Sequence, residues 1–337
     1  MAKRGRSQES GEDRLIARYF KPLARHPAAL GLSDDAACLK PPKGYDLVMT
    51  VDAVVAGVHF LPDDPPASIA RKALRVNLSD LAAKGAKPLG FLLTLALPPH
   101  TGTKFLTPFA RALAQDAQTF GCPVLGGDTT ATPGPLTISI SAFGTVPQGK
   151  MVQRKGARPG DLVMVTGTIG DAALGLRVSQ RASLEKQWRL KRGQRAFLVD
   201  RYREPRPRNV LALAVRRYAS AAMDVSDGLA GDLAKLCRAS GVSAVAEAAQ
   251  VPLSPAATIA LATRPDLIET ILTGGDDYEI LCTVPPSRAT RFTAAATAAG
   301  VPLTTIGRIE RGQGEARFVD ADDRALRFGR VSFSHFG

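Results

Sequence analysis

The sequence predicts a protein of two domains with an α/β or α+β fold. Its 337 residues exceed the size at which a single hydrophobic core stops growing, so two domains are expected. Apolar runs typical of strands alternate along the chain with stretches in which apolar residues recur at helical spacing. This alternation indicates mixed structure, although the pattern alone does not separate α/β from α+β. The turn-rich stretch 147–160 is the best boundary, which gives domains 1–150 and 151–337.

The N-terminal half contains patterns for three helices and four strands. Acidic residues followed by apolar residues at helical spacing predict the first helix, and Gly85 with Pro88 ends the second. Strict alternation of apolar and polar residues predicts a half-exposed strand over 136–143. We expect helices over 12–26, 67–85 and 103–120, and strands over 46–51, 91–97, 123–125 and 136–143.

The C-terminal half repeats the order of strand, turn and helix. We expect strands over 161–166, 221–225 and 278–284, a helix that starts at 171, and a helix over 228–239. The tripeptide Gly-Gly-Asp occurs at 126–128 and again at 274–276. This echo is too short to prove a duplication, but it suggests that both domains present similar turns to one cleft.

Composition describes an ordinary globular chain with a basic excess. The formal net charge is +13, and segment 181–208 alone has ten Lys or Arg against three Asp or Glu. Trp188 and Tyr202 lie among these bases, as in a single-strand nucleic-acid binder. We favour a solvated helical hairpin here and keep a nucleic-acid-binding module as the alternative.

Other features of the sequence indicate a cytoplasmic protein. There is no apolar run of membrane-spanning length, and the first residues lack the apolar region of an export signal. The four cysteines are far apart and form no CxxC pair, which favours reduced, buried thiols over a zinc site or a disulfide framework.

Acidic residues gather in short turns framed by glycine and serine, where strands are expected to end. Like charges brought together there repel unless a cation lies between them, and oxygen ligands favour Mg²⁺. The glycines also let backbone N–H groups approach phosphate oxygens. Taken singly, each Gly-Gly-Asp is as well explained by plain turn chemistry. The segments are Asp34-Asp35, Asp52, Asp80, Gly126-Gly127-Asp128-Thr129, Asp224-Val225-Ser226-Asp227-Gly228 and Gly274-Gly275-Asp276-Asp277.

Several familiar signatures are missing from the sequence. It contains no GxxxxGK[ST] loop, no strand-associated GxGxxG and no protein-kinase catalytic loop. None of its four histidines stands in a recognisable Ser or Cys frame, so no catalytic nucleophile or base is predicted. His59, near Asp52 in sequence, is the one histidine in an interesting position, although an ordinary histidine at a strand end explains it as well.

The motifs, taken together, resemble thiamine-monophosphate kinases. They arrive in that family's order over roughly residues 10–337, and AGVHF and GGDDYE distinguish it from the related aminoimidazole ribonucleotide and selenophosphate synthetases. The segments that carry the resemblance are GLSDDAA (31–37), TVDAVVAGVHF (50–60), KALRVNLSDLAA (72–83), LGGDTT (125–130), GARPGD (156–161), MDVSDGL (223–229) and GGDDYE (274–279).

The resemblance implies an ATP-dependent kinase that phosphorylates thiamine monophosphate to thiamine diphosphate. It also implies a homodimer whose N-terminal sheets pair into a barrel, with a C-terminal α+β domain completing each active site. By the same resemblance, three sets of residues receive roles. Several Mg²⁺ ions would be held by Asp35, Thr50, the carbonyl of Val51, Asp52, Asp80, Asp128, Asp224 and Asp227; ATP would meet Gly127, Asp128, Arg154 and Ser226; the substrate would meet His59, Asp276 and Phe333.

The sequence departs from the family's pattern at three places. The family often has Glu where Asp276 stands, and Val51 replaces a frequent Thr, so only its carbonyl would serve a metal. The C-terminal close has no Trp, so Phe333 or Phe328 would supply the ring that meets thiamine. The alternative functions are another ATP-dependent synthetase of this superfamily, acting through an acyl or selenide phosphate, and the nucleic-acid-binding module at 181–208. Selenophosphate synthetases resembling this fold carry a reactive Cys or selenocysteine near the N-terminus, and residues 1–30 contain no Cys.

Overall fold

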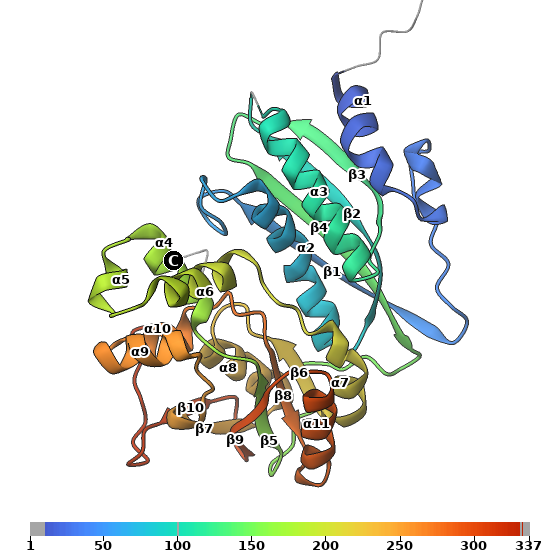
Figure 1. The fold of residues 1–337 in the computed structure, drawn as a ribbon. Coiled ribbons are helices and arrows are strands. Elements are labelled where there is room, and N and C mark those ends of the chain that lie inside the picture. Colours follow the sequence, from blue (N-terminus) through green and yellow to red (C-terminus); the bar gives the residue numbers. More distant parts are fainter. Residues whose placement is uncertain (1–10, 100, 331, 333–337) are drawn as a thin grey trace, which may run out of the picture. The chain divides into compact units, whose positions relative to one another are not determined.

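Residues 11–99, 101–330 and 332 are described by the computed structural model (Figure 1). Its contacts divide the chain into two units. Unit 1 comprises the described residues up to Lys43, with Met49–Asn77 and Pro88–Phe143; unit 2 comprises Gly44–Val48, Leu78–Lys87 and the described residues from Gly144 onward. The stretch around Asp80 therefore belongs to unit 2.

A four-stranded sheet forms the centre of unit 1. The strand order is β1-β4-β2-β3, and β2 pairs with β3 in parallel. Helices α2 and α3 lie side by side on one face of this sheet (Figure 1), and Arg75 of α2 holds Asp116 of α3 in a bidentate ion pair at 2.6 and 2.9 Å. The elements are β1 (Tyr45–Val55), α2 (Pro66–Ala83), β2 (Lys87–Leu97), α3 (Thr103–Thr119), β3 (Val124–Ala131) and β4 (Thr137–Pro147).

The first predicted helix is confirmed only in part. Helical structure runs from residue 11 to residue 23, but it is divided into α1 (Gly11–Leu15), a π-helical turn η1 (Ile16–Phe20) and a 3₁₀ turn η2 (Lys21–Leu23). Pro22 lies in the last of these turns and has no N–H to donate to the i→i−4 bonds of an α-helix. A further 3₁₀ segment, η3 (Pro27–Leu32), follows.

A six-stranded sheet forms the centre of unit 2, in the order β10-β7-β9-β5-β8-β6. Its pairs are antiparallel except β10 with β7, which is parallel. The strands are β5 (Leu162–Thr166), β6 (Ala221–Asp224), β7 (Ser243–Glu247), β8 (Ile280–Val284), β9 (Leu303–Glu310) and β10 (Ala316–Val319). The helices are α4 (Asp171–Gln180), α5 (Leu184–Gln187), α6 (Arg192–Arg203), α7 (Ala212–Tyr218), α8 (Leu229–Ser240), α9 (Pro255–Thr263), α10 (Leu267–Thr273) and α11 (Pro286–Ala298), with 3₁₀ turns η4 (Asn209–Leu211) and η5 (Ala248–Gln250).

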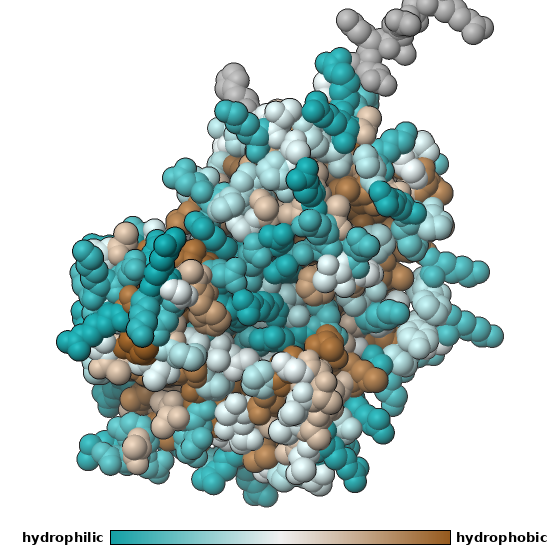
Figure 2. All heavy atoms as spheres, viewed as in Figure 1, coloured by the Kyte–Doolittle hydropathy of each residue, from teal (hydrophilic) through white to brown (hydrophobic). Residues whose placement is uncertain are grey.

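Alternation along the strands of unit 2 builds a hydrophobic core on each face of the sheet. Val163 and Val165 of β5 pack with residues of α4, α6, α8, α9 and α10, whereas Met164 between them packs with residues of α7 and α11. Unit 2 is therefore a three-layered arrangement of helices, sheet and helices, and the prediction of a mixed α and β protein is confirmed. On the face shown in Figure 2, hydrophilic side chains predominate over α4, α5 and α6.

Three local predictions need correction. Gly126-Gly127-Asp128 does not form a turn after a strand, because β3 continues through it to Ala131. Likewise Asp52 lies inside β1, which extends to Val55. All four cysteines are free thiols, but only three are buried, since Cys38 is exposed.

Candidate active site

The basic segment 181–208 does not present its aromatic residues to solvent. It folds into α5 and α6 with their connections, and Trp188 and Tyr202 are each only 2% exposed. Their rings pack inside unit 2, so they cannot stack on nucleic-acid bases. The feature that suggested a single-strand binder is therefore absent from the described fold of this segment.

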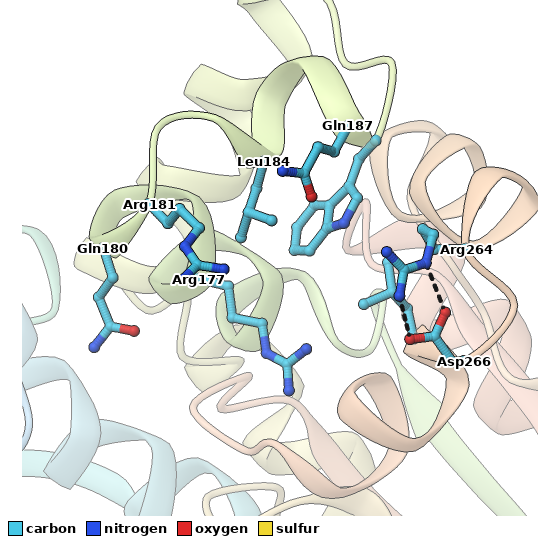
Figure 3. Close-up of a pocket in the computed structure, with 9 residues that line it drawn as sticks. Arg177, Gln180, Arg181, Leu184, Gln187, Arg264 and Asp266 are labelled. Carbon is cyan, nitrogen blue, oxygen red and sulfur yellow. Dashed lines mark hydrogen bonds and ion pairs between the residues drawn. The ribbon is translucent and has the colours of Figure 1, made fainter.

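A cavity of about 530 Å³ lies beside this segment (Figure 3). Arg177 and Arg181 point toward it from the end of α4, and Arg264 at its rim forms a bidentate ion pair with Asp266. None of the residues predicted to bind metal, ATP or substrate lines this cavity. It is therefore separate from the site that the motifs predict.

In unit 2 the two aspartate-rich segments 224–228 and 274–279 run side by side. Strand β6 pairs antiparallel with β8, and backbone hydrogen bonds of 2.8–2.9 Å, donated by the N–H groups of Val225, Asp276 and Tyr278, continue the pairing past the strand ends. Sequence motifs that are far apart along the chain thus form one structure. Asp224, Ser226, Asp227 and Asp276, all predicted site residues, belong to it.

Gly275 allows these two segments to approach closely. Its φ is +74°, in the left-handed region, and a Cβ atom at this position would lie 2.3 Å from the carbonyl oxygen of Ser226. A side chain would force the segments apart. The second glycine of Gly-Gly-Asp is therefore required for the contact between the motifs.

Lys84 connects three further predicted residues in unit 2. Its Nζ donates a hydrogen bond of 2.8 Å to the carbonyl oxygen of Ala222 in β6. Burial lowers the pKa of the Lys84 ammonium; the nearby charge of Asp224 opposes this shift, Arg154 adds to it, and Asp80 opposes it. The charges of Asp80, Arg154 and Asp224 therefore all act on one partly buried cation.

Asp232, on α8, holds the turn that carries Ser226 and Asp227. Its Oδ2 accepts the N–H groups of both residues at 3.0 Å, and its side chain is fully buried. Lys235, one turn further along α8, donates to Asp232 Oδ1 at 2.8 Å and to Asp227 Oδ2 at 2.5 Å. Burial raises the pKa of Asp232, and the charge of Lys235 opposes that shift.

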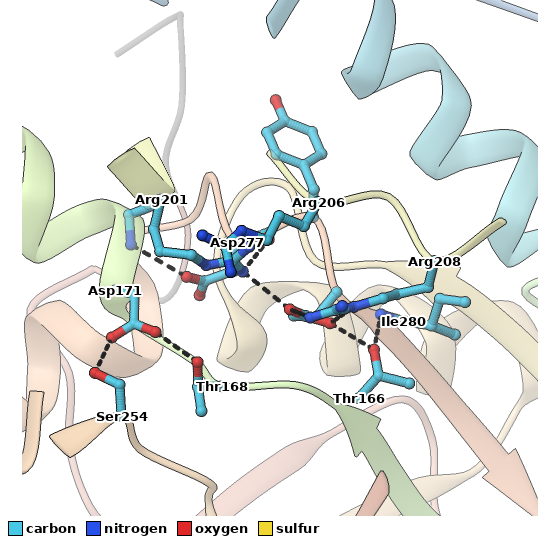
Figure 4. Close-up of polar contacts among 12 residues, drawn as sticks. Thr166, Thr168, Asp171, Arg201, Arg206, Arg208, Ser254, Asp277 and Ile280 are labelled. Atoms are coloured by element: carbon cyan, nitrogen blue, oxygen red, sulfur yellow. Dashed lines mark hydrogen bonds and ion pairs between the residues drawn. The ribbon is translucent and has the colours of Figure 1, made fainter. Parts of the chain in front are cut away.

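Glu279 at the end of the second motif is a structural anchor, and its partners Thr166, Arg201 and Arg208 are labelled in Figure 4. Its carboxylate is completely buried and accepts hydrogen bonds from Arg201 at 2.9 Å, from Thr166 at 2.7 Å and from two nitrogens of Arg208. Two cations are thus bound to one carboxylate in the interior. Arg208, at the end of the basic segment 181–208, is engaged in this network.

Asp277 is a second structural acid of this motif (Figure 4). Its Oδ2 accepts the N–H of Gly170 at 2.8 Å and its Oδ1 accepts that of Ala172 at 3.4 Å, so it binds the start of α4. Burial raises its pKa well above the usual value, and the hydrogen bond from Gly170 opposes that shift. Of the three acids in GGDDYE, Asp276 is the one that remains partly exposed.

In unit 1, Asn77 and Val55 position two of the predicted residues. Asn77 Oδ1 accepts the backbone N–H of Asp52 at 3.1 Å, which ties α2 to β1 at the aspartate. His59 Nδ1 accepts the N–H of Val55 at 3.1 Å. In a neutral imidazole the proton is then on Nε2.

Asp128 lies on the accessible side of the sheet. It is exposed and stands beside Thr94 of β2 in the parallel register. Gly127 before it packs so closely against β2 that a Cβ atom would lie 1.8 Å from the carbonyl oxygen of Leu93. Asp35 is exposed, and its N–H donates to the side chain of the adjacent Asp34 at 2.8 Å.

The donor set is chemically suited to Mg²⁺, which binds hard oxygen ligands. Among the described residues, however, no three side chains of His, Cys, Asp or Glu gather closely enough to hold one ion. This matches the usual way in which Mg²⁺ is bound, with one or two carboxylates per ion and the rest of its shell supplied by water and substrate phosphates.

The C-terminal tail bears on which aromatic residue, Phe328 or Phe333, fits the substrate role predicted from the sequence. Phe328 packs edge-on against the buried Phe318, with ring centroids 6.1 Å apart, and belongs to the core of unit 2. Ser332 donates a hydrogen bond of 3.5 Å to the carbonyl oxygen of Asp227. Phe333 lies outside the described residues.

Comparison with known families identifies the protein's relatives. Residues 33–146 match the N-terminal domain, and residues 158–320 the C-terminal domain, of the AIR synthase related proteins. The thiamine-monophosphate kinase of Caulobacter vibrioides is 45% identical over 91% of this chain and 86% of its own. The chain belongs to the thiamine-monophosphate kinase family. The resemblance carried by the motifs is thereby confirmed.

Solved structures agree with this family. A thiamine-monophosphate kinase from Stenotrophomonas maltophilia K279a superposes with a TM-score of 0.81 at 38% identity, covering 93% of this chain and 96% of that one. A structure described as AaThiL complexed with AMPPCP and TMP superposes with a TM-score of 0.75 at 30% identity, covering 90% of this chain and 91% of that one.

Among the described residues, no helix combines the length and apolar composition needed to cross a bilayer.

Sequence reasoning missed two residues that shape this site. Lys235 and Asp232 are three residues apart on α8, a spacing that places both on one helix face. That spacing after Asp-Val-Ser-Asp-Gly was a readable signal.

Proposed function

We propose that this protein phosphorylates thiamine monophosphate with ATP, which gives thiamine diphosphate and ADP. Membership of the kinase family supports the assignment, as does similarity over 90% of the chain to a relative solved with AMPPCP and TMP. The observation that carries the proposal is the joining of segments 224–228 and 274–279 into one hydrogen-bonded structure that leaves Asp227 and Asp276 partly accessible.

ATP is assigned to Gly127, Asp128, Arg154 and Ser226. Arg154 is exposed, so its guanidinium can reach a phosphate. The N–H of Ser226 is held by Asp232, and we therefore assign the serine hydroxyl to the nucleotide.

Thiamine monophosphate is assigned to His59, Asp276 and Phe333. Because Nδ1 of His59 accepts a hydrogen bond from Val55, its Nε2–H is the donor toward the substrate phosphate. Phe333 is the aromatic residue we assign to the thiamine rings, because Phe328 is committed to the core.

Several Mg²⁺ ions complete the proposed site, held by Asp35, Thr50, the carbonyl of Val51, Asp52, Asp80, Asp128, Asp224 and Asp227. When bound, Mg²⁺ offsets the negative charge of the two phosphate-bearing substrates.

The proposed reaction is a direct in-line transfer without a phosphoenzyme. The second pKa of the acceptor phosphate is about 6, so its oxygen is already deprotonated at neutral pH and needs no general base. The main obstacle is repulsion between two anions, and the residues assigned here act by positioning and charge. We accordingly assign no catalytic nucleophile or base.

A homodimer is proposed from the sheet of unit 1. One face of this sheet is covered by α2 and α3 (Figure 1), whereas β1 presents Met49 and Val51 with 67% and 62% of their surface exposed. We propose that the same face of a second copy covers them and closes a barrel. Met49→Lys should then convert a dimer to a monomer in light scattering, whereas Met151→Lys, at an exposed methionine of unit 2, should not.

The two domains predicted from the sequence have different proposed roles. We propose residues 1–150 as the domain for ATP, Mg²⁺ and dimerisation, and residues 151–337 as the domain that completes the site.

A cytoplasmic location is proposed because all four cysteines are free thiols, as expected in a reducing compartment.

The decisive experiment measures ADP release with thiamine monophosphate, thiamine, and representative amide and selenide acceptors in turn, with mass spectrometry of the product. We expect turnover with thiamine monophosphate and loss of it in Asp128→Asn and Asp227→Asn. Turnover of an amide or selenide instead would favour another enzyme of the superfamily. Salt-sensitive oligonucleotide binding without ATP turnover would favour the nucleic-acid hypothesis.

A further inference from the structure

Lys235 makes two ion pairs beside the proposed metal site, and one of them involves a proposed ligand. Its ammonium lies 2.5 Å from Asp227 Oδ2 and 2.8 Å from Asp232 Oδ1. Asp232 is completely buried, whereas 36% of the Asp227 side chain and 30% of the Lys235 side chain are exposed. The lysine therefore bridges one structural carboxylate and one carboxylate that solutes can reach.

The two carboxylates depend on Lys235 differently. Asp232 also accepts the N–H groups of Ser226 and Asp227, so it stays in place whether or not Lys235 contacts Asp227. The side chain of Asp227 has Lys235 as its one ion-pair partner among the described residues. A lysine side chain has four flexible carbons and a compact charge, so the ammonium can leave one carboxylate while it keeps the other.

We propose that Lys235 acts as an internal cation that neutralises Asp227 when no metal is bound and withdraws to Asp232 when a divalent ion takes that carboxylate. The inference rests on the proposed function, because it needs Asp227 to be a metal ligand. It assigns Lys235 as a positioning residue. Its charge weakens metal binding and, in return, stabilises the aspartate turn of the metal-free protein.

The opposite effects of Lys235 on metal binding and on the metal-free protein have an electrostatic cause. A divalent ion on Asp227 and an ammonium on Asp232 repel each other, and even in water this repulsion at about 5 Å is enough to change a dissociation constant by roughly tenfold. Without metal, removal of the ammonium leaves Asp227 and the buried Asp232 as adjacent like charges.

The test measures Mn²⁺ binding to the full-length protein without nucleotide, from the electron paramagnetic resonance signal of free Mn²⁺, together with the thermal midpoint in chelator-treated buffer. We expect Lys235→Met to lower the Kd for Mn²⁺ about tenfold and to lower the metal-free midpoint. Lys235→Gln keeps hydrogen-bond donors without the charge and should also lower the Kd for Mn²⁺. This second variant keeps the proposal testable if the methionine variant folds poorly. Lys186→Met, at an exposed lysine of α5, should change neither quantity.

Measuring Asp227→Asn as well distinguishes a failure of the lysine inference from a failure of the metal assignment. If Asp227→Asn weakens Mn²⁺ binding but neither Lys235 variant tightens it, the lysine inference is overturned and the proposed function stands. If Asp227→Asn leaves Mn²⁺ binding unchanged, Asp227 is not a ligand, and this overturns both the inference and that part of the metal assignment. A purely structural lysine would lower the thermal midpoint without tightening Mn²⁺ binding.

Discussion

Replacement of Glu279 by glutamine should cost unit 2 much of its stability. The carboxylate of Glu279 is completely buried, and Arg201, whose side chain is 2% exposed, and Arg208 both donate to it. Glutamine keeps the size of the side chain and one carbonyl oxygen, but it carries no charge. Two guanidinium groups would then lie in or near the interior without their counter-ion.

The size of the loss follows from burial. Removal of one partner of a buried ion pair costs about 3–5 kcal/mol, because the remaining charge is left uncompensated. For a domain the size of unit 2, each kcal/mol lowers the thermal midpoint by about 2–4 °C, so Glu279→Gln should lower it by about 6–20 °C. A matched control is Glu310→Gln, whose partners Arg308 and Arg317 are 71% and 57% exposed, and this change should cost about 0–1 kcal/mol.

Urea unfolding followed by circular dichroism would measure both variants against the unmodified chain. We expect Glu279→Gln to lower the free energy of unfolding strongly and Glu310→Gln to lower it hardly at all. If the two variants lie within about 1 kcal/mol of each other, a difference typical of surface pairs, then Arg201 and Arg208 do not depend on Glu279 for their burial.

Three further changes test other parts of the structure. Gly275→Ala should reduce kcat/KM by at least about tenfold, because the new Cβ would meet the carbonyl oxygen of Ser226, whereas Gly149→Ala has a similar positive φ without close neighbours and should keep its activity. Asp277 has a raised folded-state pKa, so it favours the folded state most below the carboxyl's ordinary pKa, and this advantage is lost as pH rises through the folded value. The unfolding free energy of the unmodified chain minus that of Asp277→Asn should therefore fall between pH 4 and neutrality, and a constant difference would contradict the assignment. Asp128→Asn should keep the thermal midpoint of the metal-free protein but lose ADP release by about a hundredfold or more, and near-normal turnover would remove it from the site.

Periodicity in the sequence predicted the strands and the two long helices of the N-terminal half, but only part of the C-terminal half. Helices α2, α3 and α8 and strands β5, β6 and β8 lie within two residues of their expected bounds, and α4 begins where expected, because each has an apolar pattern of sufficient length and clear end signals. Strands β1, β2 and β4 each extend four residues beyond one expected end, and β7, β9, β10, α7, α9, α10 and α11 were not predicted. The sequence pattern gave a wrong prediction at Gly127, because glycine occurs both in turns and where two strands approach closely. Gly127 suggested a turn, but it allows β3 to approach β2, and this close contact depends on strand pairing that no local pattern encodes.

The basic segment shows a second limit of sequence reasoning. Trp188 and Tyr202 stand among arginines and lysines, so their neighbours in sequence suggested an exposed surface. In the fold they point into the core while the bases surround them, since a helix can bury one side and expose the other. Which side is buried depends on the packing partner, and that partner is remote in sequence.

The sequence predicted which residue types form the candidate site, but it did not predict which of the acids are buried and which are exposed. The sequence presents GGDDYE as one acidic motif, yet its three acids differ in environment: Asp276 is partly exposed, whereas Asp277 and Glu279 are buried in the network that joins α4, α6 and β8. No sequence pattern distinguishes them, because the difference arises from neighbours such as Gly170 and Arg201.

This difference explains how an acidic segment can lie beside another acidic segment before any metal binds. The charge of Glu279 is matched by two arginines, the raised pKa of Asp277 reduces its charge, and Lys235 accompanies Asp227. Only part of the formal negative charge of the two motifs is therefore presented to solutes. The same internal cations that allow the segments to pair also set how strongly a divalent ion is attracted, so the stability of the metal-free fold and the affinity for metal should change in opposite directions when Lys235 is replaced.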